Sequence, residues 1–256
     1  MKLRILTPIV GLVFGLGLFP TNGLAADEIS EEATGILRSM SNYLGSLESF
    51  SYDYDVDTEV ILNTGEKLQI SSSGDAKIRR PDGFLFVRHG GFESGELYFD
   101  GKFTTLYGKS QNIFYQIENV GTIDDAIDNL RYELGVDAAG ADLMYANPYE
   151  ILMEGVESGE YIGKGVVGGV EGHHLAFRQE EVDWQIWIQT GETPVPIKYI
   201  ITTKWMTGAP QYSIRLRNWN VNLDFGGETF QFTPPAGATE AEDFFINEVG
   251  EITVGE

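Results

Sequence analysis

The densest set of groups that could bind a metal or transfer protons is a run of carboxylates, Asp53, Asp55, Asp57 and Glu59. They alternate with apolar residues between Phe50 and Leu62, which is typical of a β-strand with one buried and one solvated face. Carboxylates two residues apart on such a strand lie roughly 6.5 to 7 Å from one another. A metal ion needs ligands that converge on it. We therefore interpret the run as a solvated strand face and predict no metal site there.

The chain has three histidines, His89, His173 and His174, and no cysteine. Neighbouring residues on a strand point to opposite faces, so His173 and His174 cannot chelate one ion from a regular strand. The sequence also lacks the motifs Gly-x-Ser-x-Gly, His-Glu-x-x-His and Gly-x-x-x-x-Gly-Lys-Ser/Thr, which mark common hydrolase and nucleotide sites. We therefore predict a protein that is not an enzyme, with no catalytic residue, no metal and no cofactor.

The first 25 residues have the layout of a secretory signal peptide. Lys2 and Arg4 form a basic region, residues 5–19 are apolar, and Gly23-Leu24-Ala25 has the pattern of a cleavage site. The apolar run is short and interrupted by glycine, which disfavours a transmembrane helix, although an uncleaved anchor is the alternative. We expect cleavage after residue 25, export from the cytoplasm, and no membrane span in the mature chain.

The net charge restricts the partners. The full chain carries a formal charge of −22, and loss of residues 1–25 would leave 15 basic against 39 acidic residues, or −24. Such a field repels phosphate backbones and anionic lipid headgroups at long range, which argues against nucleic acid as a partner. It is compatible with a basic protein partner or with solubility alone. We expect a monomer without disulfide bonds.

Three segments have the apolar spacing of helices. Residues 27–47 predict an amphipathic helix with Asp27 or Ser30 as its N-cap. Residues 122–135 and 148–153 predict shorter helices in the middle of the chain, the latter with Pro148 in its first turn. These helices are expected to pack on a sheet and to fill its concave face.

The rest of the chain has the pattern of strands and turns. Six or seven β-rich runs between residues 50 and 118 predict a meander, and further runs follow between 161 and 219. The strongest turn signal is Asp100-Gly101, typical of a type I′ hairpin turn, which needs positive φ at both residues. Other turns are predicted at glycines: Gly65, Gly74 and Gly169.

This pattern predicts a mainly β fold, a curved antiparallel sheet with an N-terminal helix and short central helices on its concave face. We expect one domain over residues 26–238. Residues 239–256 are rich in carboxylates and form a predicted acidic tail with residues 244–246 as its anchor.

Several segments together resemble the predicted periplasmic proteins grouped as domain of unknown function 2092. They are residues 97–102, 106–107, 121–124, 142–145, 174–179, 182–185 and 230–237. The last of these, Phe230-x-Phe232-x-Pro234-Pro235-Ala236-Gly237, is also similar, more loosely, to the outer-membrane lipoprotein carriers. The resemblance covers about residues 31–237. A cysteine that is common in the family is replaced here by Gly172, which weakens any thiol role at that position.

The resemblance implies an unclosed half-barrel whose helices lid an apolar hollow, in the periplasm of a Gram-negative bacterium. It also implies binding of an acyl chain of a lipid or lipoprotein. Strands with apolar residues on both faces agree with such a hollow, although an ordinary core explains them too. The predicted ligand wall is Tyr98, Phe99, Phe103, Leu106, Tyr115, Phe177, Trp184 and Trp187, and the predicted headgroup ligands are Arg178 and Arg215.

Two points stay open at the level of the sequence. Either Tyr98, Phe103 and Tyr107 or Leu97, Phe99 and Leu106 face the hollow. The alternative function is a periplasmic protein-interaction or envelope-sensor module, with a packed core and no small ligand.

Overall fold

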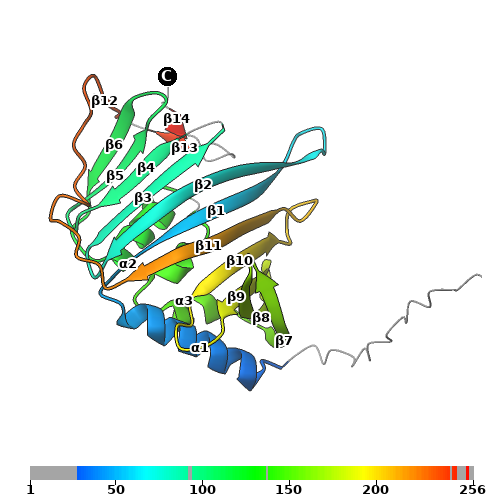
Figure 1. Ribbon diagram of the computed structural model, residues 1–256. Helices are drawn as coiled ribbons and strands as arrows, with labels where there is room; N and C mark the ends of the chain where they lie inside the picture. The colour runs from blue at the N-terminus through cyan, green and yellow to red at the C-terminus, as the bar shows by residue number, and fades with distance from the viewer. Residues whose placement is uncertain (1–27, 92–93, 137, 243, 247–251, 254–256) are drawn as a thin grey trace, which may run out of the picture.

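The computed structural model describes residues 28–256 except 92–93, 137, 243, 247–251 and 254–256, so the predicted signal peptide lies outside the described residues. Its main element is a 12-stranded sheet in the order β12-β6-β5-β4-β3-β2-β1-β11-β10-β9-β8-β7, which does not close into a barrel (Figure 1). The first strands are β1 Ser49–Ile61, β2 Lys67–Arg79, β3 Gly83–Gly90, β4 Gly95–Phe99, β5 Phe103–Gly108 and β6 Ile113–Glu118. The others are β7 Ser158–Val167, β8 Val170–Arg178, β9 Val182–Gln189, β10 Pro196–Thr203, β11 Gln211–Val221 and β12 Thr239–Glu240.

The sheet consists of two antiparallel meanders that meet at β1 and β11. Strands β1 to β6 are neighbours in chain order, as are β7 to β11, and β11 pairs with β1 along most of its length. The short β12 adds to β6 in parallel. Twist accumulates over this many strands and curves the sheet. The prediction of a mainly β fold with a curved, unclosed antiparallel sheet is confirmed.

The N-terminal helix α1, Glu31–Ser46, lies on the concave side at one end of the sheet (Figure 1). Ser30 is its N-cap, because the Ser30 Oγ accepts a hydrogen bond from the Ala33 amide at 3.3 Å. Carboxylates in the first turn suit the positive end of the helix dipole. The apolar stripe is buried completely, as the sequence predicts; it comprises Ala33, Leu37, Met40 and Leu44.

Short helices from the middle of the chain fill the rest of the concave face. α2, Ile123–Asp128, begins with a capping box in which Thr122 and Asp125 bond each other's backbone amides. It continues as the π-helical turn η1, Asn129–Glu133, and is followed by the 3₁₀ turn η2, Ala141–Met144, and by α3, Pro148–Met153. Together with α1 they pack into one apolar core with the sheet. The predicted helices are confirmed.

Large side chains pack the middle of the core. The largest fully buried ones come from both meanders and from the helices: Phe50, Phe84, Phe99, Leu130, Leu175 and Trp184. Ring centroids of Phe84 and Phe99 lie 5.4 Å apart, and those of Phe177 and Trp184 lie 4.2 Å apart.

Gly74 does not turn the chain, so that prediction is wrong. Strand β2 runs through it without a break and pairs with β1 from Lys67 to Arg79. A Cβ atom at Gly74 would lie 2.0 Å from the carbonyl oxygen of Val87 and 2.5 Å from the Tyr54 ring. The Tyr54 hydroxyl crosses this position and donates to that same oxygen at 3.0 Å. Glycine is required here by a close approach within the sheet.

The hairpin at Asp100-Gly101 is confirmed, but its turn is not of type I′. Positive φ occurs at Gly101, 86°, and not at Asp100. Instead, the Asp100 Oδ1 accepts hydrogen bonds from the amides of Lys102 and Phe103 at 3.0 and 2.8 Å. An aspartate whose side chain accepts hydrogen bonds from the amides two and three residues ahead forms an Asx-type turn. Aspartate is therefore favoured here by its side chain and not by the φ angle of a type I′ turn.

The two faces of this hairpin are covered by different parts of the chain. Phe99 and Leu106 are buried on the concave side, in the common core. The outer face is covered by residues 225–238, which we call the C-terminal strap and which lead from β11 to β12. Its Phe232 ring lies 5.2 to 5.4 Å from the rings of Tyr98, Tyr107 and Phe114. Side chains Leu97, Phe99 and Leu106 therefore face the concave side, which settles the point left open by the sequence.

Candidate functional site

The sheet divides where β10 and β11 separate. These strands pair from Thr202↔Gln211 to Lys198↔Arg215. Beyond Arg215, β11 continues to Val221 paired with β1 on its other side. We call the point of separation the fork. The indole of Trp219 reaches across it, and its Nε1 donates to the carbonyl oxygen of Pro196 at 3.1 Å.

Irregular backbone in both strands produces the fork. In β11 the register with β1 shifts between Arg217 and Asn220, and Asn218 adopts a positive φ of 55°. In β10 the register with β9 shifts between Pro196 and Lys198. Bulges bend a strand and interrupt its ladder. Proline also has no N–H to offer to a neighbouring strand, so Pro196 ends the pairing on this side.

A cleft of about 490 Å³ opens at the fork. Its lining includes apolar side chains from α1, the β7–β8 turn, the loop before β10 and β11: Tyr43, Val167, Val170, Val195, Ile197, Leu216, Trp219 and Val221. Polar lining comes from Asp55, Gln189, Thr193, Arg215, Arg217 and Asn218. Leu216 and Val195 belong to the buried core, whereas Arg215 and Arg217 are exposed on the outer face. The lining therefore combines exposed residues of the outer face with residues of the buried core.

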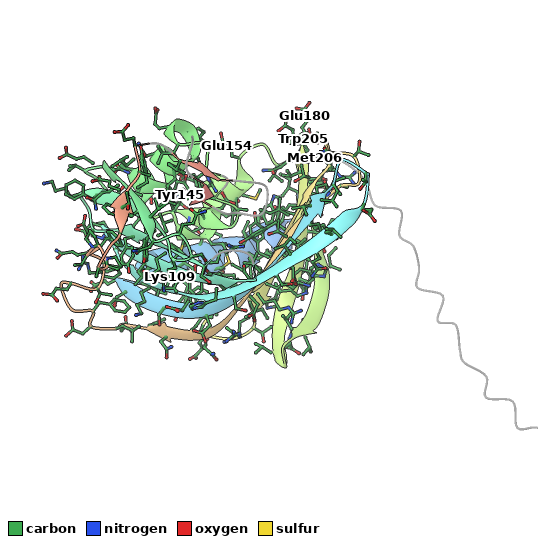
Figure 2. All side chains as sticks on the ribbon, turned by 90° about the horizontal axis from the view of Figure 1, so that it is seen from above. Lys109, Tyr145, Glu154, Glu180, Trp205 and Met206 are labelled. Atoms are coloured by element: carbon green, nitrogen blue, oxygen red, sulfur yellow. The ribbon has the colours of Figure 1, made fainter. Side chains whose placement is uncertain are left out.

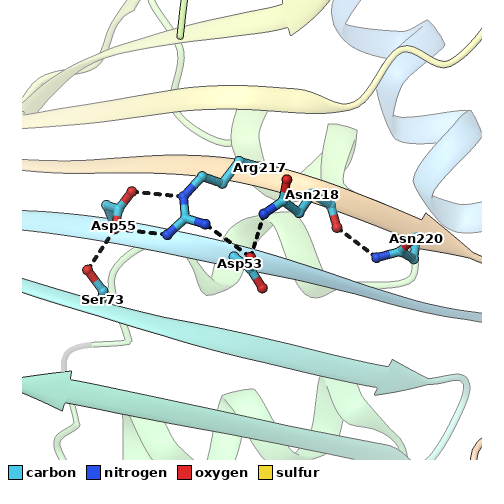
Figure 3. A network of polar contacts seen from close by, with 6 residues as sticks. All are labelled: Asp53, Asp55, Ser73, Arg217, Asn218 and Asn220. Atoms are coloured by element: carbon cyan, nitrogen blue, oxygen red, sulfur yellow. Dashed lines mark hydrogen bonds and ion pairs between the residues drawn. The ribbon is translucent and has the colours of Figure 1, made fainter.

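Arg217 is held by the carboxylates of β1 (Figure 3). Its Nε donates to the Asp55 Oδ2 at 3.0 Å, and its Nη1 donates to the Asp53 Oδ2 at 3.0 Å. Asp53 also accepts from Asn218, and Asp55 from Ser73. The hydrogen bonds from Arg217, and then the bond from Ser73, lower the pKa of Asp55.

The carboxylate row lies along the outer face of β1, as predicted. Asp57 accepts from the Ser71 hydroxyl at 2.6 Å, and Glu59 accepts from the Lys67 ammonium at 2.9 Å. Across the described ranges of the chain, no three His, Asp or Glu side chains form a group that could hold a metal ion.

His173 and His174 point to opposite faces of β8, as predicted. The His173 Nδ1 lies 3.1 Å from the Tyr161 hydroxyl. His174 stacks on Trp187 with ring centroids 3.9 Å apart, and its Nε2 lies 2.9 Å from the Gln185 Oε1. Burial lowers the pKa of His174, which favours the neutral form of the ring.

The structure divides the predicted ligand wall between the two faces of the sheet. Five residues lie on the concave side within or against the core: Phe99, Leu106, Tyr115, Phe177 and Trp184. Three lie on the outer face: Tyr98, Phe103 and Trp187. Tyr98 and Phe103 line a second, smaller pocket of about 230 Å³ beneath the C-terminal strap. None of the eight is among the residues that line the cleft at the fork.

The two predicted headgroup arginines lie far apart in the fold. Arg178, at the end of β8, bonds Asp183 at 3.3 Å on an exposed surface. Arg215 lies at the fork and lines the cleft. Arg215 is predicted from the sequence, whereas Lys198, directly opposite it on β10, is not. The signal for the fork was Pro194-Val195-Pro196, because two prolines next to a strand limit its pairing.

A second surface feature lies at the other end of the molecule, at the tips of the β1–β2 and β10–β11 hairpins. Trp205 is 70% exposed in the β10–β11 turn, as is its neighbour Met206 to a lesser extent, and Leu62 and Leu68 are exposed in the β1–β2 hairpin. The hairpins touch, since a Cβ atom at Gly208 would lie 3.0 Å from Ile61. Figure 2 shows Glu180 close to Trp205 and Met206 at this tip. We call Leu62, Leu68, Trp205 and Met206 the apolar tip.

A family model matches residues 33–242, which is most of the chain. The chain belongs to the family described as Predicted periplasmic protein (DUF2092). The resemblance seen in the sequence and the periplasmic location are thereby confirmed. No helix within the described residues is long and apolar enough to cross a membrane. No curated protein matches the chain.

Several solved structures are similar to this DUF2092 protein at low identity. The Mycobacterium tuberculosis lipoprotein LppX is 13% identical with a TM-score of 0.47, over 77% of this chain and 100% of LppX. An uncharacterized conserved protein from Thermus thermophilus is 10% identical with a TM-score of 0.48, over 82% of this chain and 99% of that one. The LolA superfamily protein NE2245 from Nitrosomonas europaea is 10% identical with a TM-score of 0.41, over 78% and 97%.

Proposed function

We propose that this periplasmic protein is a non-catalytic, monomeric binding protein or carrier for a lipid or lipoprotein acyl group. The observation that supports it is the cleft at the fork, whose lining combines exposed residues of the outer face with residues of the apolar core. Its volume of about 490 Å³ lies in the range of small-molecule sites. An acyl chain placed there would gain about 25 cal/mol for each Å² of apolar surface removed from water. Such binding needs no cofactor.

The cleft is the proposed entrance, and the concave core is the proposed depth of the site. Val195, Leu216 and Trp219 form the inner end of the cleft and belong to the core or pack against it. The predicted wall residues on the concave side, among them Phe177 and Trp184, lie further along this core. A long chain would reach them only when core side chains move aside. Arg215 at the mouth would contact the polar end of the ligand.

The experiment uses protein purified without detergent from the periplasm and analysed by native mass spectrometry and solvent extraction. A co-purifying species with an acyl chain is the expected result. Val170→Asp places a carboxylate on a cleft-lining residue that is 38% exposed, so the fold should survive and the lipid should be lost. Val166→Asp is the matched control, because Val166 is on the same hairpin, is 70% exposed and does not line the cleft. Ligand-free protein that also binds no added fatty acid would contradict the proposal.

The apolar tip favours a second candidate function, an interaction module that docks a basic protein. Exposed Trp and Met side chains are typical anchors of protein interfaces. The carboxylates around them are Glu66, Glu180 and Glu181, and none of the three forms an ion pair with a residue that the structure describes. An apolar centre with an acidic rim fits a partner whose apolar patch is surrounded by lysine or arginine.

A photo-crosslinking amino acid at position 205, introduced in living cells, tests this second function. The expected result is one crosslinked protein whose capture weakens at high salt, because the rim contacts are ionic. The same amino acid at Tyr132 is the control, since Tyr132 is 79% exposed and lies outside the apolar tip. Equal crosslinking at both positions, or none at 205, would reject the interaction module.

A further inference from the structure

Lys198 and Arg215 form a pair of like charges at the fork. They lie directly opposite each other on β10 and β11, at the last paired position before the strands separate. Side chains in such cross-strand positions have Cβ atoms roughly 5 Å apart, and like charges there destabilise a sheet. Repulsive pairs of this kind are unexpected in a chain with a formal charge of −22, which has many carboxylates to place beside each cation.

The carboxylates near the pair, Asp55 and Asp57, form their hydrogen bonds with other residues, although the charge of Arg215 helps to lower the pKa of both. On its other side Arg215 lies opposite Asp55, but Asp55 is bonded by Arg217 and by Ser73. Asp57 accepts from Ser71. Neither Lys198 nor Arg215 makes an ion pair with any residue among those that the structure describes. Burial, and then the nearby Arg215, lower the pKa of Lys198.

The Lys198 side chain lies over an aromatic ring. Its Nζ lies 5.0 Å from the centroid of the Trp187 ring, within the range of a cation–π contact. Trp187 is in turn stacked on His174. The ammonium therefore lies over a stacked pair of rings, and its residue is paired with Arg215, which lines the cleft. Apolar lining begins beside the pair with Ile197 and Leu216.

We propose that Lys198 and Arg215 bind the anionic headgroup, a phosphate or a carboxylate, of an amphiphile whose acyl chain occupies the cleft. This proposal rests on the proposed function and narrows its ligand to anionic amphiphiles. An anion between the two cations would remove their repulsion and accept hydrogen bonds from both. Zwitterionic or neutral headgroups would bind with a less favourable free energy, because they carry no net charge to attract the two cations.

The experiment compares probes that share one chain and differ in the headgroup. They are dodecyl phosphate, dodecanoate and dodecanol, each below the concentration at which it aggregates, and inorganic phosphate without a chain. Binding is measured by calorimetry on wild type, Lys198→Met and Arg215→Gln. Lys198→Met keeps an unbranched side chain on Trp187 and removes the charge. Lys164→Met is the matched control, because Lys164 is an exposed β7 lysine paired with Glu171 and does not line the cleft.

The expected result is that wild type and Lys164→Met bind dodecyl phosphate about tenfold more tightly than dodecanol, the ratio for one charge-assisted contact. In Lys198→Met and Arg215→Gln this preference should fall below about threefold while dodecanol binds as before. Asp57→Asn should tighten dodecyl phosphate, since it removes a nearby negative charge. In the absence of ligand, Lys198→Met should melt no lower than wild type, whereas a lysine with a structural role would leave a less stable protein.

Other outcomes separate this proposal from the proposed function. Equal binding of dodecanol and dodecyl phosphate to wild type would overturn the headgroup site and leave the acyl cleft standing. Inorganic phosphate could instead bind as tightly as dodecyl phosphate and lose this binding in Lys198→Met. That result would support an anion site but reject a lipid as its ligand. Absence of binding by every probe would overturn both.

Discussion

Trp219 and Pro196 close the fork between them. The Nε1 of Trp219 donates to the Pro196 carbonyl oxygen at 3.1 Å, from one separating strand to the other. The same indole lies 4.6 Å from the Tyr52 ring and 5.8 Å from the Phe50 ring, so it also packs on the core. The Trp219 side chain therefore contributes to the stability of the sheet and also lines the cleft.

Trp219→Phe should loosen the fork while keeping an aromatic ring on Tyr52. The loss of one hydrogen bond is expected to lower the free energy of unfolding by about 1 kcal/mol. Exchange of a bound acyl probe should become faster, because Pro196 is no longer tied to β11. Stopped-flow dissociation and denaturant unfolding measure the two effects. Unchanged exchange kinetics in a destabilised variant would show that this residue does not control access.

Gly74→Ala should be strongly destabilising. A methyl group there meets the backbone oxygen of Val87 at 2.0 Å, and backbone cannot move aside cheaply. We expect a loss of about 3 kcal/mol or more in the free energy of unfolding, at the upper end for overpacking. Gly35→Ala is the control, because an alanine Cβ at this exposed site of α1 meets nothing within 4 Å. It should stabilise the protein by up to about 1 kcal/mol. Similar melting curves for the two variants would contradict the description of β2.

The hydrogen bonds of Arg217 with Asp53 and Asp55 should make a small contribution to the free energy of unfolding that depends on pH. Arg217 and Ser73 lower the pKa of Asp55 in the folded protein, so this carboxylate contributes stability above its unfolded pKa of about 3.9. That contribution is lost as the pH falls through the lower, folded value. Since the groups are exposed, Arg217→Met should cost only about 0.5 kcal/mol at pH 7 and less than that near pH 2. Urea unfolding at both pH values checks this, and a constant difference between wild type and variant would refute it.

Phe232→Ala should release the C-terminal strap from the outer face. The ring contacts Tyr98, Tyr107 and Phe114, and its removal should cost about 2 kcal/mol, the value for a partly buried aromatic side chain. Hydrogen exchange should accelerate in residues 225–238 and in β6. The exposed neighbour Gln231 provides the control as Gln231→Ala. Acceleration spread evenly over the whole sheet would instead indicate a global loss of stability.

Local patterns in the sequence were sufficient for most elements of the fold. The stripe from Ala33 to Leu44 and the capping residues Ser30 and Thr122 act over a few neighbouring residues, so α1 and α2 could be predicted. Gly74 could not be interpreted correctly, because the groups that require glycine there, the Val87 carbonyl and the Tyr54 ring, belong to the two neighbouring strands. The turn at Asp100 was also predicted for the wrong reason, because it is stabilised by hydrogen bonds to the Asp100 side chain and not by a positive φ at this residue.

The candidate site was harder to predict than the fold. Alternation along a strand shows that Phe99 and Tyr98 have opposite directions, but not which of them is inside. Arg215 can be predicted from the sequence as a cation on a strand. The roles of Lys198 and Trp219 cannot, because they depend on where the pairing between β10 and β11 ends. The end of that pairing depends on two bulges and on Pro196, whose combined effect appears only in three dimensions.

Because the chain has no cysteine, a single introduced thiol can be labelled to measure binding of an acyl chain in the cleft. Thr193→Cys places a single thiol on an exposed residue that lines the cleft, and Thr207→Cys places one in the exposed β10–β11 turn. Each variant carries an environment-sensitive fluorophore and is titrated with dodecanoate below its aggregation limit. We predict a saturable change at position 193 that Val170→Asp abolishes, and no change at 207. No response at 193, or equal responses at both positions, would contradict binding of an acyl chain in the cleft.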